Sequence, residues 1–390
     1  LYRLVGSEMC IRDSINAFAR KRSVQPFKSG PDYIDSKFQS VAANRPSYNL
    51  DTWAMSSRDI LNMIGMVAPS DICIAEGSMG LFDGVISKGA GGNGSTADLA
   101  SITNWPVILV VDCAKQAQSV AALITGFKSF RHDITIGGVI LNNISSKRHE
   151  ALVVSEVSKT KVPILGVIPR SNELTIPERH LGLVQAEDLS DLEQLIFKLG
   201  TLIEENCDLE AIACTARNSF PPISTLQKIT PPAQRIAIAR DNAFTFTYSH
   251  LIEGWKKQGA EISFFSPLND EPPSKSDDMV WLPGGYPELY LGRLSECKNF
   301  KNGLIDFSKK GPVHGECGGY MVLGRKIIGK GGQAYDMIGM FDLVTSFEKR
   351  KLNLGYRKAK AIEPFFGIKR GSTVLGLSLI HISEPTRRYR

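Results

Sequence analysis

The chain has 390 residues, enough for two domains with a core each, since one domain usually takes about 100–200 residues. Its formal net charge of +6 is mild, and the Lys and Arg residues are scattered without interleaved aromatics, so nucleic-acid binding is not indicated. Seven cysteines without C-x-x-C spacing argue against a disulfide framework or zinc site and favour a reducing cytoplasm, and no apolar run reaches the roughly 20 residues of a membrane span.

In the first half of the chain, short apolar runs alternate with longer amphipathic stretches. The runs at residues 71–75, 106–111, 136–141 and 163–168 are typical of buried parallel strands. The stretches at 119–130 and 147–160 have the helical period expected of crossover helices. This order predicts a doubly wound α/β sheet, in which ligands gather at the carboxyl ends of the strands.

The proline-punctuated segment 205–233 has weak periodicity and is predicted to be an interdomain linker. It separates a first domain at 15–204 from a second at 234–376. In the second domain, strands at 235–240 and 261–265, a helix at 248–259 and a strand around Trp281 repeat the β-α-β order.

The two ends of the chain, residues 1–14 and 377–390, fit neither the neighbouring pattern nor the motifs described below. We expect them to be foreign segments, resembling translated adapter sequence. Ordinary divergent termini are the alternative.

Residues 312–320 (PVHGECGGY) place Cys317 between an apolar run and a predicted helix that begins with two glycines. A thiol at such a turn is exposed above the sheet, and the amides of the following helix favour a thiolate and an oxyanion. Upstream, residues 279–288 (MVWLPGGYPE) supply a second glycine turn. Cys317 is therefore predicted to be a nucleophile, with the amides of Gly285 and Gly318 holding an oxyanion, in preference to the inert buried cysteine that a single Cys usually is.

Several motifs together resemble one family. They are residues 27–35 (FKSGPDYID), 49–51 (NLD), 76–84 (EGSMGLFDG), 94–99 (GSTADL), the cysteine motif, 345–351 (TSFEKRK) and 354–357 (LGYR). In order and spacing they resemble the glutamine-hydrolysing cobyrinic or hydrogenobyrinic acid a,c-diamide synthases, over about residues 15–376. The resemblance implies an α/β fold: a P-loop-type doubly wound domain followed by a class I glutamine amidotransferase-like domain.

The resemblance also implies roles for residues of the first domain. Asp32 and Glu76 match positions associated with Mg²⁺, and Lys28 matches a nucleotide or phosphate contact. Tyr33, Ile34, Asp35 and Asp83 resemble positions that engage or orient the corrinoid carboxylates. Competing interpretations are packing for Tyr33 and Ile34, a solvated lysine for Lys28, and solvated loop acids for Asp32 and Glu76.

Two elements of the family pattern do not occur in this sequence. There is no G-x-x-x-x-G-K-[ST] loop, and the glycine-rich residues 89–94 are expected to form a mobile loop and not a substitute for it, so the motif that usually cradles the phosphates of ATP is not found in this sequence. The family's catalytic histidine block is missing after residue 376. His381 lies at about the sequence position where the family has this histidine, but the residues around it do not resemble the family's block. His314 is expected to have a structural or pocket role. The remaining histidines, His132, His149, His180 and His250, are expected at the surface.

The implied enzyme is a cytoplasmic carbon–nitrogen ligase of cobalamin biosynthesis that uses glutamine, ATP with Mg²⁺ and a corrinoid, without nucleic-acid or membrane partners and with a possible homodimer. A cobyric acid synthase-like enzyme is the nearest competing hypothesis. A catalytically incompetent module that binds corrinoid or glutamine would belong to a different class of protein, and a partition-type ATPase is a more remote hypothesis.

Overall fold

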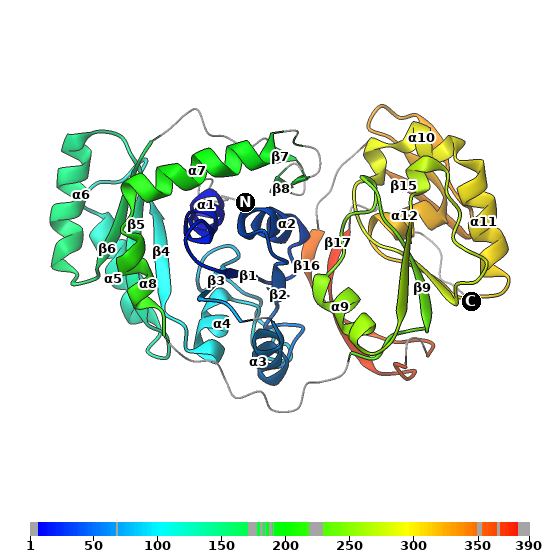
Figure 1. The fold of residues 1–390 in the computed structure, drawn as a ribbon, viewed down its shortest axis with the longest axis horizontal. Helices are drawn as coiled ribbons and strands as arrows, with labels where there is room; N and C mark the ends of the chain where they lie inside the picture. Colours follow the sequence, from blue (N-terminus) through cyan, green and yellow to red (C-terminus); the bar gives the residue numbers. More distant parts are fainter. Residues whose placement is uncertain are drawn as a thin grey trace. The chain divides into compact units, whose positions relative to one another are not determined.

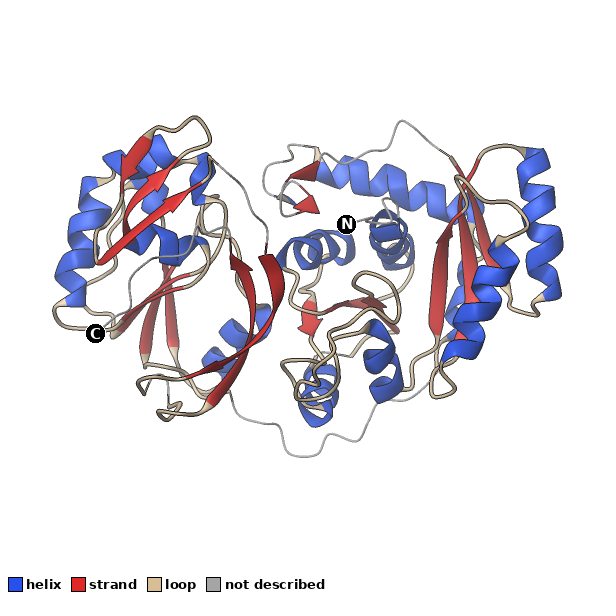
Figure 2. Ribbon diagram, turned by 180° about the vertical axis from the view of Figure 1, so that it is seen from behind, coloured by secondary structure: helices blue, strands red, loops and turns tan. Residues whose placement is uncertain are grey.

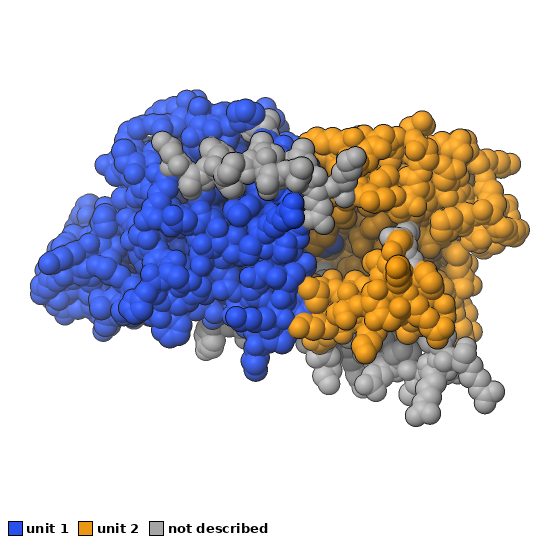
Figure 3. All heavy atoms as spheres, turned by 90° about the horizontal axis from the view of Figure 1, so that it is seen from below, with its two compact units in different colours: residues 1–227 blue, residues 228–390 orange. Residues whose placement is uncertain are grey.

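The structure is a computed structural model, and it describes residues 7–67, 69–170, 178–179, 182–183, 185–186, 189, 191–217, 229–348, 353–364 and 367–380. The chain divides into two compact units, residues 1–227 and 228–390, coloured separately in Figure 3. The division falls within the segment 205–233 predicted as the linker.

The first unit alternates strands and helices along most of its length (Figure 1). Its elements are α1 (Ser7–Ala19), β1 (Val24–Ser29), α2 (Tyr33–Ala43), β2 (Tyr48–Leu50), α3 (Ser57–Met66), β3 (Ile72–Glu76), α4 (Thr96–Thr103), β4 (Val107–Asp112), α5 (Val120–Phe130), β5 (Ile136–Ile144), α6 (Lys147–Lys159), β6 (Ile164–Pro169), β7 (Glu178–Arg179), β8 (Gly182–Leu183), α7 (Leu192–Asn206) and α8 (Leu209–Thr215).

Two groups of parallel strands organise this unit. The first has the order β2-β1-β3 and the second the order β4-β5-β6. Helices α5 and α6 bury Val120, Ile124, Val153 and Val157 in the same apolar cluster as β4 and β5. The predicted strands and both predicted crossover helices are present, with ends shifted by a residue or a few, because β-branched runs and helical periodicity are strong local signals.

Ordered structure also occurs in segments that the sequence analysis placed outside the two domains. Helix α1 begins at Ser7, and the buried side chains of Arg12 and Asp13 form an ion pair at 2.8 Å. Helix α8 lies inside the predicted linker, where the N–H of Asp208 donates to the carbonyl of Leu165 at 2.9 Å and Ile212 is buried. Its seven residues are too few for the sequence pattern to distinguish a helix from a proline-flanked linker.

The second unit begins with a β-α-β arrangement and ends with smaller sheets (Figure 2). Its elements are β9 (Arg235–Ala239), α9 (Ser249–Lys257), β10 (Glu261–Phe265), the 3₁₀ helix η2 (Pro267–Asn269), β11 (Met279–Leu282), the 3₁₀ helix η3 (Pro287–Leu289), α10 (Leu291–Glu296), α11 (Lys298–Ser308), β12 (Val313–Gly315), α12 (Gly318–Leu323), β13 (Gly324–Ile328), β14 (Ala334–Asp336), β15 (Phe341–Ser346), β16 (Asn353–Lys360) and β17 (Thr373–Ile380).

The main sheet of the second unit is parallel, with strand order β10-β9-β11-β12. Successive side chains of a strand point to opposite faces, so Ala237 and Ala239 join the core beneath α10, α11 and α12, while Ile236 and Ile238 pack with Trp255 of α9. The remaining strands form the mixed sheet β14-β13-β15 and the antiparallel hairpin β16-β17, which continues past residue 376 to Ile380.

Parallel strands with packed helices in both units confirm the predicted α/β class. Among the described residues, no helix is both long and apolar enough to cross a membrane.

Candidate functional site

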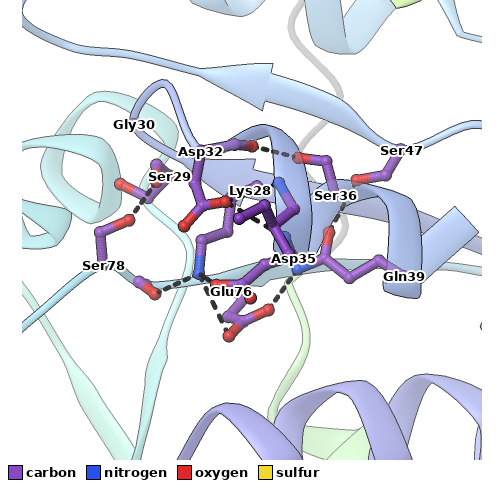
Figure 4. Close-up of polar contacts among 12 residues, drawn as sticks. Lys28, Ser29, Gly30, Asp32, Asp35, Ser36, Gln39, Ser47, Glu76 and Ser78 are labelled. Atoms are coloured by element: carbon purple, nitrogen blue, oxygen red, sulfur yellow. Dashed lines mark hydrogen bonds and ion pairs between the residues drawn. The ribbon is translucent and has the colours of Figure 1, made fainter. Parts of the chain in front are cut away.

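The carboxyl ends of β1 and β3 bring a buried charged group together with the start of α2. We call it the Lys28 cluster; it consists of Lys28, Asp32, Asp35, Gln39 and Glu76 (Figure 4). β1 and β3 are adjacent parallel strands in which Lys28 pairs with Glu76, so both side chains reach the same edge of the sheet.

Lys28 is the centre of the cluster. Its Nζ lies 2.7 Å from Oδ2 of Asp35 and 3.2 Å from Oε1 of Glu76, and it donates to the carbonyl of Gly77 at 3.3 Å. Lys28, Asp35 and Glu76 are all buried. The surrounding contacts make Lys28 a residue fixed by three acceptors and not a solvated lysine.

The ionisation of the cluster reflects a balance of burial and charge. Burial by itself lowers the pKa of the Lys28 ammonium, but the carboxylates of Asp35, Glu76 and Asp32 outweigh it and raise that pKa. Burial raises the pKa of Glu76 to about 8, against the lowering effect of Lys28, and raises that of Asp32 to about 6 with help from Asp35. The site therefore holds a permanent cation among acids that resist losing their protons.

Asp32 also has a structural role as the residue that caps the beginning of α2. Its Oδ1 accepts the backbone N–H groups of Ile34 at 2.8 Å and Asp35 at 3.1 Å, which makes it the N-cap. The loop before the helix is fixed by Asn49, whose Nδ2 donates to the carbonyls of Gly30 and Asp32 at 2.9 and 2.8 Å. Gly30 has φ of 80°, a left-handed conformation that a glycine adopts without strain.

The loop after β3 contacts the same region. The Ser78 hydroxyl donates to the carbonyl of Ser29 (Figure 4). The Ser78 N–H donates to Oγ1 of Thr96 at 3.0 Å. The contacts of Asp83 are different: this exposed carboxylate accepts the N–H of Gly80 at 2.9 Å within its own turn. The structure does not bring Asp83 into the Lys28 cluster.

The other predicted substrate residues start α2. Ile34 is buried, and Tyr33 is half-buried at the first helical position. Asp35 belongs to the cluster through its contact with Lys28.

The glycine-rich residues 89–94 are tied to the segment after β2. The N–H of Ala90 donates to the carbonyl of Trp53 at 2.8 Å, and that of Gly91 to the carbonyl of Thr52 at 2.9 Å. A Cβ on Gly89 would lie 2.0 Å from the Trp53 carbonyl oxygen, so this close approach requires glycine. Contacts from a segment distant in the sequence therefore hold the backbone of the loop that was expected to be mobile.

Cys317 occupies a sharp turn between β12 and α12 in the second unit. Its φ of 49° and ψ of −118° lie outside the conformations that non-glycine residues usually adopt, so the surrounding structure must hold the turn. The tight packing is visible at Gly319, where a Cβ would lie 2.1 Å from the carbonyl oxygen of Leu282.

The predicted oxyanion glycines lie against this turn. The backbone N–H groups of Gly318 and Gly285 hydrogen-bond the Cys317 sulfur. A Cβ on Gly284 would lie 2.9 Å from Cβ of Cys317, which places the two glycine turns in contact. The structure therefore brings together the three residues predicted for glutamine hydrolysis.

The thiol of Cys317 is accessible but surrounded by many protein atoms. This desolvation raises its pKa to about 11, although the Gly318 and Gly285 amides act in the opposite direction. The resting group is thus a thiol, and nucleophilic attack requires a base. His314, on β12, packs its ring against Trp281 at 4.3 Å between centroids, and its Nε2 lies 3.7 Å from Oε2 of Glu316. His381 lies outside the described residues.

Gln39 and Ser47 are functional candidates that sequence reasoning missed. Gln39 donates to Glu76, and Ser47 donates to Gln39. The available signal was that Gln39 follows Asp35 by four residues, which places both on one face of α2.

The residues fit Mg²⁺ in the kind of donor they offer. Mg²⁺ is usually held by one or two carboxylates together with water and phosphate oxygens. Oε1 of Glu76 is buried without a hydrogen-bond partner and has only its ion pair with Lys28, so it can accept a further ligand. Within the described ranges, no group of three or more His, Cys, Asp or Glu side chains is arranged to hold a metal by itself.

Comparison with known proteins finds matches to both units. Residues 14–184 match the CobQ/CobB/MinD/ParA nucleotide binding domain, and residues 235–378 match the CobB/CobQ-like glutamine amidotransferase domain.

Curated relatives match most of the chain. A hydrogenobyrinate a,c-diamide synthase of Rhodobacter capsulatus is 46% identical over 353 residues, covering 90% of this chain and 81% of the relative. Proteins of the same name from Brucella anthropi and Rhizobium meliloti are 45% and 44% identical, covering 88% and 89% of this chain and 79% and 80% of their own lengths.

Proposed function

Since this chain belongs to the hydrogenobyrinate a,c-diamide synthase family, a family of amidating ligases, we propose that it converts the a- and c-carboxylates of hydrogenobyrinate or cobyrinate to amides, using ATP and glutamine. The observation that carries the proposal is the pairing of two sites in one chain. One unit has Cys317 against the Gly285 and Gly318 amides, and the other has the buried Lys28 cluster.

The proposed reaction begins with glutamine. The sulfur of Cys317 attacks the side-chain amide carbon, and the N–H groups of Gly285 and Gly318 stabilise the negative oxygen that forms. The C–N bond then breaks, ammonia leaves with the proton it needs, and water later hydrolyses the thioester to glutamate and the free thiol. Because the resting thiol has a raised pKa, this step needs a base to accept its proton.

In the first unit, the corrinoid carboxylate attacks the γ-phosphorus of ATP to give an acyl phosphate and ADP. Ammonia then attacks the acyl carbon and displaces phosphate, leaving the amide. Lys28 keeps its charge in the buried site, so it would hold an anionic carboxylate or phosphate oxygen that displaces one of its three present acceptors. Asp32 and Glu76 would hold Mg²⁺, which neutralises triphosphate charge when bound. Asp83 stays a candidate for substrate contact from its exposed turn.

Binding and glutaminase measurements on the full chain test the proposal. Hydrogenobyrinate is titrated calorimetrically into the wild type and into Cys317→Ala, and ammonia release from glutamine is measured in parallel. We expect corrinoid binding by both proteins and ammonia release by the wild type alone. Corrinoid binding without ammonia release by the wild type would instead favour the binding module, and a chain that binds no corrinoid would overturn the proposed substrate.

A further inference from the structure

The amide of Gln39 bridges a buried serine and a buried carboxylate. Its Nε2 donates to Oε2 of Glu76, and its Oε1 accepts the hydroxyl of Ser47 at 2.7 Å. Gln39 is 0% exposed, and Glu76 and Ser47 are also buried. Figure 4 shows Gln39 between Ser47 and Glu76, with Glu76 next to Lys28.

These contacts determine which way the Gln39 amide faces. The form of Glu76 that would bind a metal is the ionised carboxylate, which only accepts hydrogen bonds, so in that form the NH₂ end of the amide must face Glu76. The oxygen end then faces Ser47, whose hydroxyl satisfies it. Ser47 is itself held, because its backbone N–H donates to Oγ of Ser40 at 2.9 Å. The amide therefore has one favoured orientation, set from outside the Lys28 cluster.

The two oxygens of Glu76 consequently have different surroundings. Oε2 is occupied by Gln39, whereas Oε1 has the ion pair with Lys28 at 3.2 Å and no hydrogen bond. A half-turn of the carboxylate only exchanges its two equivalent oxygens, whereas any smaller rotation would leave the Gln39 donor unpaired in a buried site, which is unfavourable. Gln39 thus keeps one carboxylate oxygen, Oε1, on the side of Lys28 and without a hydrogen bond.

We propose that Gln39, oriented by Ser47, is a positioning residue that fixes the Glu76 carboxylate so that Oε1 faces the metal and substrate side of the Lys28 cluster. The inference rests on the proposed function for the metal role of Glu76, while the orientation itself is a property of the protein alone. Hydrogen-bond partners of metal-ligating carboxylates typically change metal affinity by about 10–100-fold when they are removed.

The test compares the full chain with Gln39→Leu, Ser47→Ala and the control Gln25→Leu. Leucine keeps the approximate volume of glutamine but has no donor. Gln25 is a matched control because it is also a buried glutamine, on the same strand as Lys28, and its Nε2 donates to the carbonyls of Pro26 and Pro46 at 3.0 and 2.9 Å.

Two measurements are made on each protein. Mn²⁺, which accepts the same oxygen ligands as Mg²⁺, is titrated and its free form followed by electron paramagnetic resonance. Crystal structures then give the position of the Glu76 carboxylate. We expect Gln39→Leu to bind Mn²⁺ at least about 10-fold more weakly with a rotated Glu76. Ser47→Ala should show a smaller loss, and Gln25→Leu should match the wild type in both measurements.

The positioning role of Gln39 and the metal role of Glu76 can be contradicted independently of each other. If Gln39→Leu keeps both the wild-type carboxylate position and the wild-type Mn²⁺ affinity, the positioning role is overturned. A weakening of the same size in Gln25→Leu would also overturn it, since any buried glutamine would then have the effect. If the wild type itself binds no Mn²⁺, the proposed metal role of Glu76 fails, while the crystal structures still decide whether Gln39 sets the orientation.

Discussion

The Nζ of Lys28 lies 2.7 Å from Oδ2 of Asp35, and both side chains are buried. This pair belongs to a cluster in which one ammonium faces the acids Asp32, Asp35 and Glu76. Negative charge in excess of the single cation has to be compensated by protons or by a bound cation, which agrees with the raised pKa of Asp32 and of Glu76.

Removing the cation should destabilise the first unit strongly. Lys28→Met leaves buried carboxylates without their partner, and breaking a buried ion pair in this way costs about 3–5 kcal/mol. Urea denaturation, fitted with a separate transition for each unit, gives the free energy of unfolding. The control is Lys147→Met, which removes a solvent-exposed pair with Glu150 and should change stability by less than about 1 kcal/mol. Equal effects of the two substitutions would contradict the prediction.

The two tasks of Asp32 can be separated by two substitutions. Asp32→Ala loses the N-cap of α2 and should cost about 1 kcal/mol. Asp32→Asn keeps a side-chain oxygen for the cap and removes only the charge, so it should retain wild-type stability while weakening Mn²⁺ binding. Urea denaturation and the Mn²⁺ titration measure the two effects. An Asn variant as unstable as the Ala variant would show that the charge, and not the cap, stabilises this turn.

Gly285 should tolerate no side chain. A Cβ there would lie 2.1 Å from the backbone oxygen of Ala243, so Gly285→Ala must displace the oxyanion turn, at a cost of about 1–3 kcal/mol and with loss of ammonia release from glutamine. Gly126→Ala is the contrasting case, because this exposed position in α5 has nothing within 4 Å of the new Cβ. It should stabilise the protein by about 0.5–1 kcal/mol. Thermal unfolding together with the ammonia assay distinguishes the two.

His250 should make stability depend on pH. Burial lowers its pKa from 6.5 to about 4, so between these values the unfolded chain binds a proton that the folded chain does not. The stabilising contribution of this residue is therefore fully present above pH 6.5 and is lost as the pH falls toward 4. The loss is about 3 kcal/mol, because each unit of pKa difference corresponds to roughly 1.4 kcal/mol.

His250→Phe removes the titrating ring and its buried Nδ1, which has no hydrogen-bond partner. The difference in free energy of unfolding between wild type and variant, measured by urea denaturation from about pH 4 to about pH 7.5, should shrink or reverse as the pH falls. A difference that is constant over this range would mean that His250 titrates normally. His250 was expected at the surface; it is half-buried with its Nδ1 atom buried, and helix ends give no sequence signal for such packing of a single histidine.

The sequence by itself determined the features that depend on neighbouring residues in the chain. Apolar β-branched runs predicted strands such as β4 and β5, and helical periodicity predicted α5 and α6. The residues around Cys317 predicted a turn between a strand and a helix, and the structure has one there. These features could be predicted because each is set by local backbone preference and by the side-chain period of one element.

Only the tertiary structure decided which of the motif residues meet. Lys28, Asp35 and Glu76 come from three different elements, and the register of β1 against β3 brings Lys28 beside Glu76. The same packing left Asp83 in a separate turn and brought Gln39 and Ser47 into the site. Such contacts depend on strand register and on the packing of side chains that are distant in the sequence. The periodicity of a single segment carries no information about either.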